Sequence, residues 1–427
     1  MKKLLLLVIA SICAFSALAQ NQTLRVDYIF SGTDKTSEIS LWEMACYDGW
    51  AGRKCNMDSV AVRGNGQIYM TDEASGKIIY RNSFSTLFQE WQTTEEATRV
   101  RKAFENVFLL PMPSGRTVVT VELYDFKGAL SASFSHPVDP EDVLISRIPP
   151  QSEPHRYIIN NGSPEDKIDV AIVAEGYSST DMDLFYEDAE KAVNAILSHR
   201  PFSDLADRFN FVAVAIASKD SGVSVPGQGV WKNTAVGSHF NTFYMDRYLT
   251  TSHIFDLHDK LSGIPYEHIV ILANTDTYGG GGIFNSYTLT TAHHKAFEPV
   301  VVHEFGHSFA GLADEYYYDD QFVEYYYPDC EPWERNISTL FDFESKWNDM
   351  LPRFVSIPTE SHRIDVWEEI RNGADEDNFI GVYEGAGYQS RGVYRAYPDC
   401  RMKTNAAEGF CPVCRRAIEQ MIEFYTE

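Results

Sequence analysis

The sequence predicts an α+β protein in which an amino-terminal antiparallel β-sandwich precedes a mixed α/β domain. Three observations support this prediction. Apolar and polar residues alternate through much of residues 24–134, a proline-rich segment interrupts the chain near residue 150, and strand-like and helix-like patterns follow each other after it. The 427 residues, 44% of them apolar, are enough to bury two hydrophobic cores.

The first 19 residues form a separate, non-globular segment. Lys2 and Lys3 precede a short apolar run, which ends in the small-residue pattern Ala17-Leu18-Ala19. This is typical of a secretory signal peptide cleaved after Ala19, and it predicts a secreted or periplasmic protein. A membrane anchor is the weaker alternative, because the apolar run is short and ends in a cleavage pattern.

The overall charge limits the possible partners. The chain carries 61 acidic and 36 basic side chains, giving a formal net charge of −25. A chain without a basic surface is not expected to follow a phosphate backbone, and no later stretch is apolar for long enough to cross a bilayer. We therefore expect neither nucleic acid binding nor membrane insertion; the oligomeric state cannot be predicted.

The predicted β-sandwich spans residues 20–147. Short alternating runs predict its strands, and a helical insertion is expected near Glu95–Phe108; the strand candidates are Leu24–Phe30, Gln67–Thr71, Lys77–Tyr80 and Thr117–Tyr124. Residues 148–156 contain Pro149, Pro150 and Pro154 and predict a stiff linker. The second domain then spans residues 157–427.

The second domain begins with a strand, a helix and another strand. These are predicted over Asp169–Ala174, Asp181–Leu197 and Phe209–Ala217. A buried strand is expected at His268–Ala273, followed by a flexible glycine tract, Gly279–Gly282. The β-branched residues of Ile283–Thr291 favour an edge strand, which could pair with an extended substrate around Tyr287–Thr291.

The sequence His303-Glu304-Phe305-Gly306-His307 carries the predicted chemistry. Residues four apart lie one turn above each other on a helix, so His303 and His307 can hold one zinc ion, with Glu304 beside it as the general base acting on the bound water. The surrounding apolar residues predict a buried helix, in which unpartnered histidines would be costly. A chance match is therefore disfavoured.

A catalytic zinc site needs a third protein ligand. Gly311 provides a place for the helix to end and the chain to turn back, which would bring Asp314 toward the same ion. Glu315 is the alternative ligand. Either carboxylate could instead cap the helix or pair with a basic side chain.

Several segments together resemble one peptidase family. They are His303–Tyr316, Asp399–Lys403, Phe410–Arg415, Asp169–Tyr177 and Gly385–Arg395. The chain is similar to the family of secreted zinc peptidases named after an IgA-specific metalloendopeptidase. The resemblance covers nearly the whole mature chain and implies a metzincin-like fold, with an edge strand above the active-site cleft and a methionine turn at Met402 beneath the metal.

The sequence departs from the best-known metzincin pattern. HExxHxxGxxH would place glycine and histidine where this chain has Ala310 and Ala313. The stretch Gly311-Leu312-Ala313-Asp314 looks like the same turn delayed by one residue and ending in aspartate. This likeness favours Asp314 as the third ligand.

Six cysteines follow the signal segment, and an even number in an exported chain suggests disulfides. Cys46 with Cys55 is the favoured pair, because glycines between them could fold the loop back. Near the carboxyl end, Cys400 could pair with Cys411 or Cys414. The Cys411-x-x-Cys414 spacing also occurs in redox proteins, but no thioredoxin-like pattern surrounds it.

The remaining candidates are weaker and each has an ordinary structural interpretation. Tyr316, Tyr388 or Tyr394 could stabilise an oxyanion, although most tyrosines serve packing. The acidic segment Asp375-Glu376-Asp377-Asn378 could bind Ca²⁺ but lacks a full calcium loop. His293 and His294 are expected at the surface or behind the metal ligands.

The leading functional hypothesis is a secreted zinc endopeptidase acting on extracellular protein or glycoprotein substrates. One alternative is a binding or adhesion module whose zinc domain is vestigial. Another is a zinc amidase or esterase acting on cell-wall or glycan material. The sequence does not identify the substrate or the bond cut, and whether immunoglobulin A is a substrate cannot be derived from it.

Overall fold

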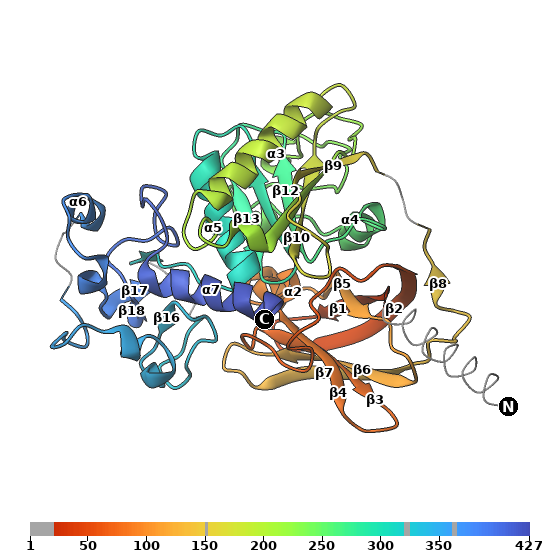
Figure 1. Ribbon diagram of the computed structural model, residues 1–427, viewed down its shortest axis with the longest axis horizontal. Helices are drawn as coiled ribbons and strands as arrows, with labels where there is room; N and C mark the ends of the chain where they lie inside the picture. Colours follow the sequence, from red (N-terminus) through yellow and green to blue (C-terminus); the bar gives the residue numbers. More distant parts are fainter. Residues whose placement is uncertain (1–20, 150–152, 320–324, 361–364) are drawn as a thin grey trace, which may run out of the picture.

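The computed structural model describes residues 21–149, 153–319, 325–360 and 365–427. The expected signal peptide and its cleavage site lie outside these residues. An amino-terminal β region packs against a mixed α/β region, and a further group of short strands and helices lies beside the latter (Figure 1). Within the described residues, no helix has the length and apolar composition needed to cross a membrane.

Two four-stranded sheets form the amino-terminal region. Their strand orders are β5-β1-β2-β8 and β4-β3-β6-β7. Pairing is antiparallel except between β2 and β8. The strands are β1 Gln22–Gly32, β2 Ser37–Asp48, β3 Gly66–Asp72, β4 Ile78–Phe84, β5 Lys102–Pro111, β6 Thr117–Tyr124, β7 Leu130–Val138 and β8 Ser146–Arg147.

The two sheets bury their alternate residues in one shared core. Leu24, Val26 and Tyr28 of β1 belong to the same buried cluster as Ile68 of β3 and Val119 of β6. This alternation is the pattern expected of strands with one buried face. The predicted β-rich amino-terminal region is therefore confirmed.

The helix predicted near Glu95–Phe108 is wrong over most of its length. A single 3-10 turn occupies Glu96–Thr98, and β5 then pairs with residues 23–32 of β1. Phe104 and Phe108, four residues apart, fit one face of a helix as well as one face of a strand. The ladder with β1 decides between them, and Phe104 packs on Phe88 and Trp91 of the short helix α2 (Leu87–Trp91).

A six-stranded sheet lies at the centre of the second region, in the order β13-β14-β12-β10-β11-β9. β10, β11, β12 and β14 are parallel, whereas β9 and β13 run antiparallel at the two edges. The strands are β9 His155–Ile159, β10 Ile168–Glu175, β11 Phe209–Val214, β12 His268–Ala273, β13 Gly280–Ile283 and β14 Tyr287–Thr291. β9 thus begins inside the segment predicted as a linker.

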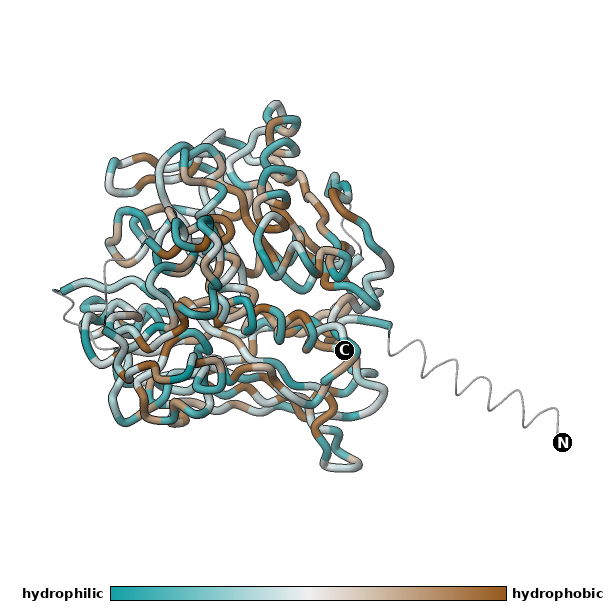
Figure 2. The backbone as a smooth tube through the Cα atoms, turned by 60° about the vertical axis from the view of Figure 1, so that its left-hand side comes forward, coloured by the Kyte–Doolittle hydropathy of each residue, from teal (hydrophilic) through white to brown (hydrophobic). Residues whose placement is uncertain are grey.

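Three long helices build the rest of this region. α3 packs against α5, and α5 packs against both α7 and the strands β13 and β14 (Figure 1). The α-helices of the described chain are α2 Leu87–Trp91, α3 Met182–Leu197, α4 Ile254–Lys260, α5 Phe297–Ala310, α6 Val366–Arg371 and α7 Pro412–Thr426. In Figure 2 most apolar segments run through the interior, and α7 alternates apolar and polar positions, as its single buried face requires.

A small third sheet lies near α7. It contains β15 Tyr317–Tyr318, β16 Ile337–Ser338, β17 Tyr383–Ala386 and β18 Tyr388–Arg395, with β18 pairing with the other three. The register places Tyr317 beside Tyr388. The chain leaving α5 is thereby joined to a strand that begins 71 residues after Tyr317.

The prediction of an edge strand over Ile283–Thr291 is also wrong. β14 is fully buried between β12 and β13, and the outermost strand is β13, formed by the tract expected to be flexible. Glycine is required there by a close approach: a Cβ atom at Gly282 would lie 2.4 Å from the backbone oxygen of Glu304. The absence of side chains therefore lets this strand lie directly against α5.

Candidate active site

Helix α5 carries three of the four predicted site residues. Most of its side chains are buried, including Val301, Phe305 and Phe309. Gly311 caps its end in the left-handed conformation, with φ 61°, and donates to the carbonyl of His307. Only glycine adopts this conformation without strain, and it reverses the chain toward the metal-ligand candidates.

The structure brings His303, His307 and Asp314 together. The two Nε2 atoms lie 3.0 Å apart, and Asp314 Oδ1 lies 3.1 Å from His303 Nε2 and 3.2 Å from His307 Nε2. Three atoms spaced this way can all lie about 2.0 to 2.1 Å from a single point, the distance of zinc ligands. The histidine side chains remain 13% and 15% exposed, so the pair can be reached from solvent.

The other nitrogen of each imidazole fixes the orientation of its ring. Nδ1 of His303 lies 2.9 Å from the carbonyl oxygen of Arg401, and Nδ1 of His307 lies 2.5 Å from that of Leu312. A carbonyl only accepts, so Nδ1 donates and Nε2 is the nitrogen that faces the other ligands. Asp314 Oδ1 has no hydrogen-bond partner in the described chain. The donor set therefore fits a divalent cation such as zinc.

Glu304 lies beside this triangle, under the edge strand. A Cβ atom at Gly280 of β13 would be only 2.8 Å from Glu304 Oε1. The backbone of the outermost strand therefore runs directly over the carboxylate. Thr288 of β14 holds the helix at the same point by donating to the backbone oxygen of Glu304.

Burial and mutual charge set the protonation of the site. Burial raises the pKa of Glu304, although His303 and His307 oppose this shift. Burial lowers the pKa of His307, but the neighbouring Asp314 outweighs it and raises the value to about 9. For Asp314, burial acts to raise the pKa, and the two histidines hold it well below its usual range. Asp314 is thus ionised, as a metal ligand must be.

Of the three tyrosine candidates, Tyr388 contacts the predicted ligands. Its hydroxyl donates a short hydrogen bond to Oδ2 of Asp314, which leaves Oδ1 directed at the histidines. The ring of Tyr316 stacks near His303, with centroids 6.5 Å apart. Tyr394 lies opposite Glu384 and Ser338 in the third sheet.

Two residues near the site escaped the sequence analysis. The carboxyl group of Glu90, on α2 of the amino-terminal region, accepts a short hydrogen bond from Tyr248. Burial raises the pKa of Glu90 to about 7, and the charges of His307, Asp314 and Glu304 also act on it. Glu90 precedes Glu304 by more than 200 residues, so no local pattern could have linked them.

Met402 lies against α5. It is fully buried, and a Cβ atom at Gly306 would lie 2.9 Å from its Sδ atom. His293 lies elsewhere: its Nε2 atom is 2.6 Å from Oδ2 of Asp188 on α3. The ring of His294 contacts Tyr278, with centroids 5.1 Å apart.

Glu315, the alternative third ligand, points away from the histidines. Its Oε1 atom lies 3.1 Å from Cys414 Sγ, in a buried group with Cys400 and Cys411. Neighbouring carboxylates on an extended segment leave on opposite sides, which explains why only one of the pair reaches the histidines. Of the two candidates, the structure therefore places only Asp314 with them.

The six cysteines of the described chain are free thiols. The predicted Cys46–Cys55 bond is not formed: Cys46 is buried in β2, and the thiol of Cys55 lies 3.2 Å from the backbone oxygen of Tyr425 in α7. Cys55 thus lies against the end of α7 and not against Cys46. The sulfur atoms of Cys400 and Cys414 lie 3.7 Å apart.

The acidic segment Asp375–Asn378 does not assemble a calcium site. Asp375 caps a 3-10 helix, Glu376–Phe379, by accepting from the backbone N–H of Asp377. Glu376 forms an ion pair with Arg415 at 2.5 Å. Among the described residues, its carboxylates do not join a group of three or more clustered ligand atoms.

Comparison with known families agrees with this arrangement. The family described as IgA Peptidase M64 matches residues 157–378 and 368–422, and the one described as Peptidase M64 N-terminus matches residues 14–135. A search of curated proteins finds no match to the chain. The family match to the second region alone covers more than half of the sequence and includes every residue of the candidate site on α5. The chain therefore belongs to the IgA peptidase M64 family, a family of peptidases.

Proposed function

We propose that this protein is a secreted zinc-dependent endopeptidase that hydrolyses peptide bonds of extracellular proteins or glycoproteins. The observation that carries the proposal is the triangle of His303, His307 and Asp314, with Glu304 beside it. Two imidazoles and one carboxylate that leave an open position are a typical catalytic zinc set. Family membership supplies the reaction class.

Each group has a distinct chemical task in this proposal. A zinc ion held by the three ligands would polarise the scissile carbonyl and lower the pKa of water. Glu304 takes a proton from the attacking water and returns it to the amine nitrogen as the C–N bond breaks. Its burial favours this exchange, because a raised pKa brings its proton affinity closer to neutral pH.

The outermost strand β13 supplies a place for the substrate. The backbone of Gly280 already exchanges hydrogen bonds with Arg247 and Leu249. An extended peptide could add to the rest of this edge through backbone hydrogen bonds, with substrate side chains alternating to either side. This assigns to Gly280–Ile283 the role that the sequence suggested for Tyr287–Thr291. The glycine backbone would place the bound peptide close to Glu304.

The proposal also includes a β-sandwich in the amino-terminal region, a metzincin-like fold in the second region and secretion of the protein. The two amino-terminal sheets with one shared core fit a β-sandwich, and Met402 beneath α5 fits the methionine turn of a metzincin-like peptidase. The pattern of residues 1–19 supports secretion. Sequencing the amino terminus of the exported protein tests the location; a chain beginning at Gln20 is expected.

The direct test is Glu304→Gln. This variant keeps the metal ligands, so it should retain zinc while losing peptide cleavage by on the order of a thousandfold. His303→Ala should lose both activity and the catalytic zinc. Exposed Glu298 on the same helix gives the matched control, and Glu298→Gln should cleave like the wild type.

A peptide-library digest separates this proposal from its alternatives. An endopeptidase cuts peptides internally and is stopped by a chelator. A binding module would cut nothing, and an amidase would release cell-wall or glycan fragments without internal peptide cleavage. Full activity of Glu304→Gln, or internal cleavage that survives chelation, contradicts the proposed mechanism.

A further inference from the structure

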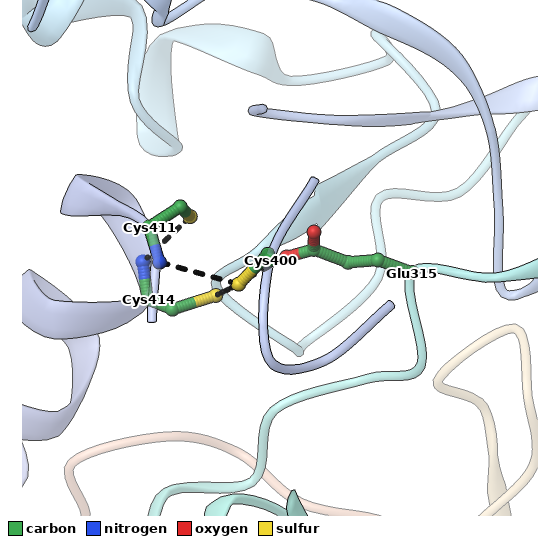
Figure 3. A group of neighbouring side chains, drawn as sticks. All are labelled: Glu315, Cys400, Cys411 and Cys414. Carbon is green, nitrogen blue, oxygen red and sulfur yellow. Dashed lines mark hydrogen bonds between the residues drawn. The ribbon is translucent and has the colours of Figure 1, made fainter. Parts of the chain in front are cut away.

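A second group of potential metal ligands lies behind the candidate active site. It consists of Glu315, Cys400, Cys411 and Cys414, whose ligand atoms all lie within 4.8 Å of one another. All four residues are fully buried. Figure 3 shows the sulfur atoms of Cys400 and Cys414 adjacent to the carboxylate of Glu315, with Cys411 at the start of the neighbouring helix.

The carboxylate of Glu315 is incompletely satisfied. Oε1 accepts from the side-chain amide of Asn336 at 3.0 Å, whereas Oε2 has no hydrogen-bond partner in the described chain. The nearby cations are engaged elsewhere: Arg395 donates to three backbone carbonyls, and Lys403 donates to that of Pro398. A fully buried carboxylate with a free oxygen is costly unless a cation compensates it.

The spacing within the group fits zinc better than a disulfide. A tetrahedral zinc with Zn–S bonds of about 2.3 Å separates two sulfurs by about 3.8 Å. The Cys400 and Cys414 sulfurs lie 3.7 Å apart, whereas a disulfide requires about 2.0 Å. The distance from Cys414 Sγ to Glu315 Oε1 is 3.1 Å. This is within about 0.5 Å of the distance expected between a sulfur and an oxygen ligand of one tetrahedral zinc ion.

The backbone around the cysteines supports negatively charged sulfur. The N–H of Cys411 donates to Cys400 Sγ at 3.2 Å, and the N–H of Cys414 donates to Cys411 Sγ at 3.4 Å. Hydrogen bonds of this kind orient metal-bound thiolates. The Cys-x-x-Cys spacing at the start of α7 is also a common zinc-binding spacing. A disulfide would use two of these sulfurs and leave the Glu315 carboxylate uncompensated.

We propose that Glu315, Cys400, Cys411 and Cys414 bind a structural zinc ion, separate from the catalytic one. Three thiolates and a carboxylate are soft enough to select zinc over calcium or magnesium. Four buried protein ligands leave no open position for a substrate, which is typical of structural rather than catalytic zinc.

The location gives this ion a positioning role. Glu315 directly follows Asp314, and Cys400 directly precedes Arg401, whose backbone oxygen accepts from His303. The N–H of Glu315 also donates to the carbonyl of Met402. A metal here would fasten the chain after α5, the loop around residues 400–403 and the start of α7 to one another. The ion would thereby fix the positions of Asp314 and His303, two proposed ligands of the catalytic zinc.

The test compares metal content across variants of the full chain purified without chelators or reductants. The wild type should hold about two zinc ions, and His303→Ala/His307→Ala about one. Substituting cobalt into this double variant should give a thiolate-to-cobalt charge-transfer band, because its remaining site contains sulfur. Cys411→Ser in the same background should lose both the ion and the band, whereas Cys330→Ser, outside the group, should keep them.

The result with the double variant is independent of the catalytic proposal. If that variant is metal-free, or if its cobalt form lacks the thiolate band, the second site is wrong. Mapping of a native disulfide between any two of Cys400, Cys411 and Cys414 also overturns it. Failure of the endopeptidase proposal would appear instead as absent cleavage by a wild-type chain that still shows the thiolate-bound metal.

Discussion

At the scale of single residues, Asp169 makes stability depend on pH. It is fully buried at the start of β10; Oδ1 accepts from Asn210 at 3.0 Å, and Oδ2 has no partner in the described chain. Burial raises its pKa to about 6. Between the unfolded value near 4 and this folded value, the folded state binds the proton more tightly, so stability falls as pH rises through that window and stays lower above it.

The Asp169→Asn variant tests this dependence. A shift of about two pKa units corresponds to at most about 3 kcal/mol. The variant should therefore be more stable than the wild type at pH 8, by about 1–3 kcal/mol in urea unfolding, and lose that advantage near pH 4. Exposed Asp166 nearby provides the control, Asp166→Asn, for which no such difference is expected. An equal effect at both pH values would contradict the assignment.

The residues whose roles the sequence predicts are those set by local geometry. His303 and His307 are four apart on one helix, and Gly311 returns the chain only three residues before Asp314, so local spacing predicts their convergence. Glu90 could not be found this way, since it enters the site from another region of the chain. The sequence suggested Glu315 as an alternative ligand beside the two histidines, but the structure places it with Cys400, Cys411 and Cys414. The sequence could not predict this contact, because Cys400 lies far from Glu315 along the chain.

At the scale of elements, the end of α5 depends on Gly311. Its φ of 61° disfavours other residues, and a Cβ atom there would lie 2.5 Å from the ring of Trp333. Gly311→Ala should therefore cost about 2–4 kcal/mol of unfolding free energy and weaken the proposed zinc binding, because the turn that presents Asp314 is displaced.

Gly229 provides a matched control for this prediction. It caps a 3-10 helix in the same left-handed region, with φ 70°, and a Cβ atom there meets nothing within 4 Å. Gly229→Ala should lose only about 1 kcal/mol of unfolding free energy, the cost of placing alanine in the left-handed backbone conformation. Equal losses for the two variants in urea unfolding would mean that contact with Trp333 contributes nothing.

Local pattern predicted most of the buried elements and failed where tertiary contacts decide. β10, β12 and α3 follow continuous apolar or helical runs and lie where expected. β5 shares its spacing of phenylalanines with a helix, and pairing with β1 makes it a strand. The glycine tract becomes β13 because α5 lies against it, which no property of glycine itself indicates.

At the scale of the whole molecule, the two regions share structure across their boundary. Val62 of the amino-terminal region belongs to the core of the second region, and Leu87, Val107 and Leu109 pack against its other core. Backbone groups also pair across the boundary, with Ser85 donating to Phe284 at 3.0 Å. The proline-rich segment separates two patterns in the sequence, but these contacts predict a single cooperative unfolding transition.

Arg25 offers a way to test this cooperativity. It is almost fully buried in β1 and pairs both with Asp27 of its own strand and with Asp259 of α4, at 2.7 and 2.5 Å. Removing it leaves the buried carboxylate of Asp27 without its cation, so Arg25→Ala should cost about 3–5 kcal/mol. Because the pair joins both regions, calorimetric unfolding and thermal inactivation of the peptidase should shift together to lower temperature.

Arg101→Ala, which breaks an exposed pair with Glu38, provides the control and should cost less than about 1 kcal/mol. Two separate calorimetric transitions, or activity that persists after the amino-terminal region has melted, would show that the regions unfold independently.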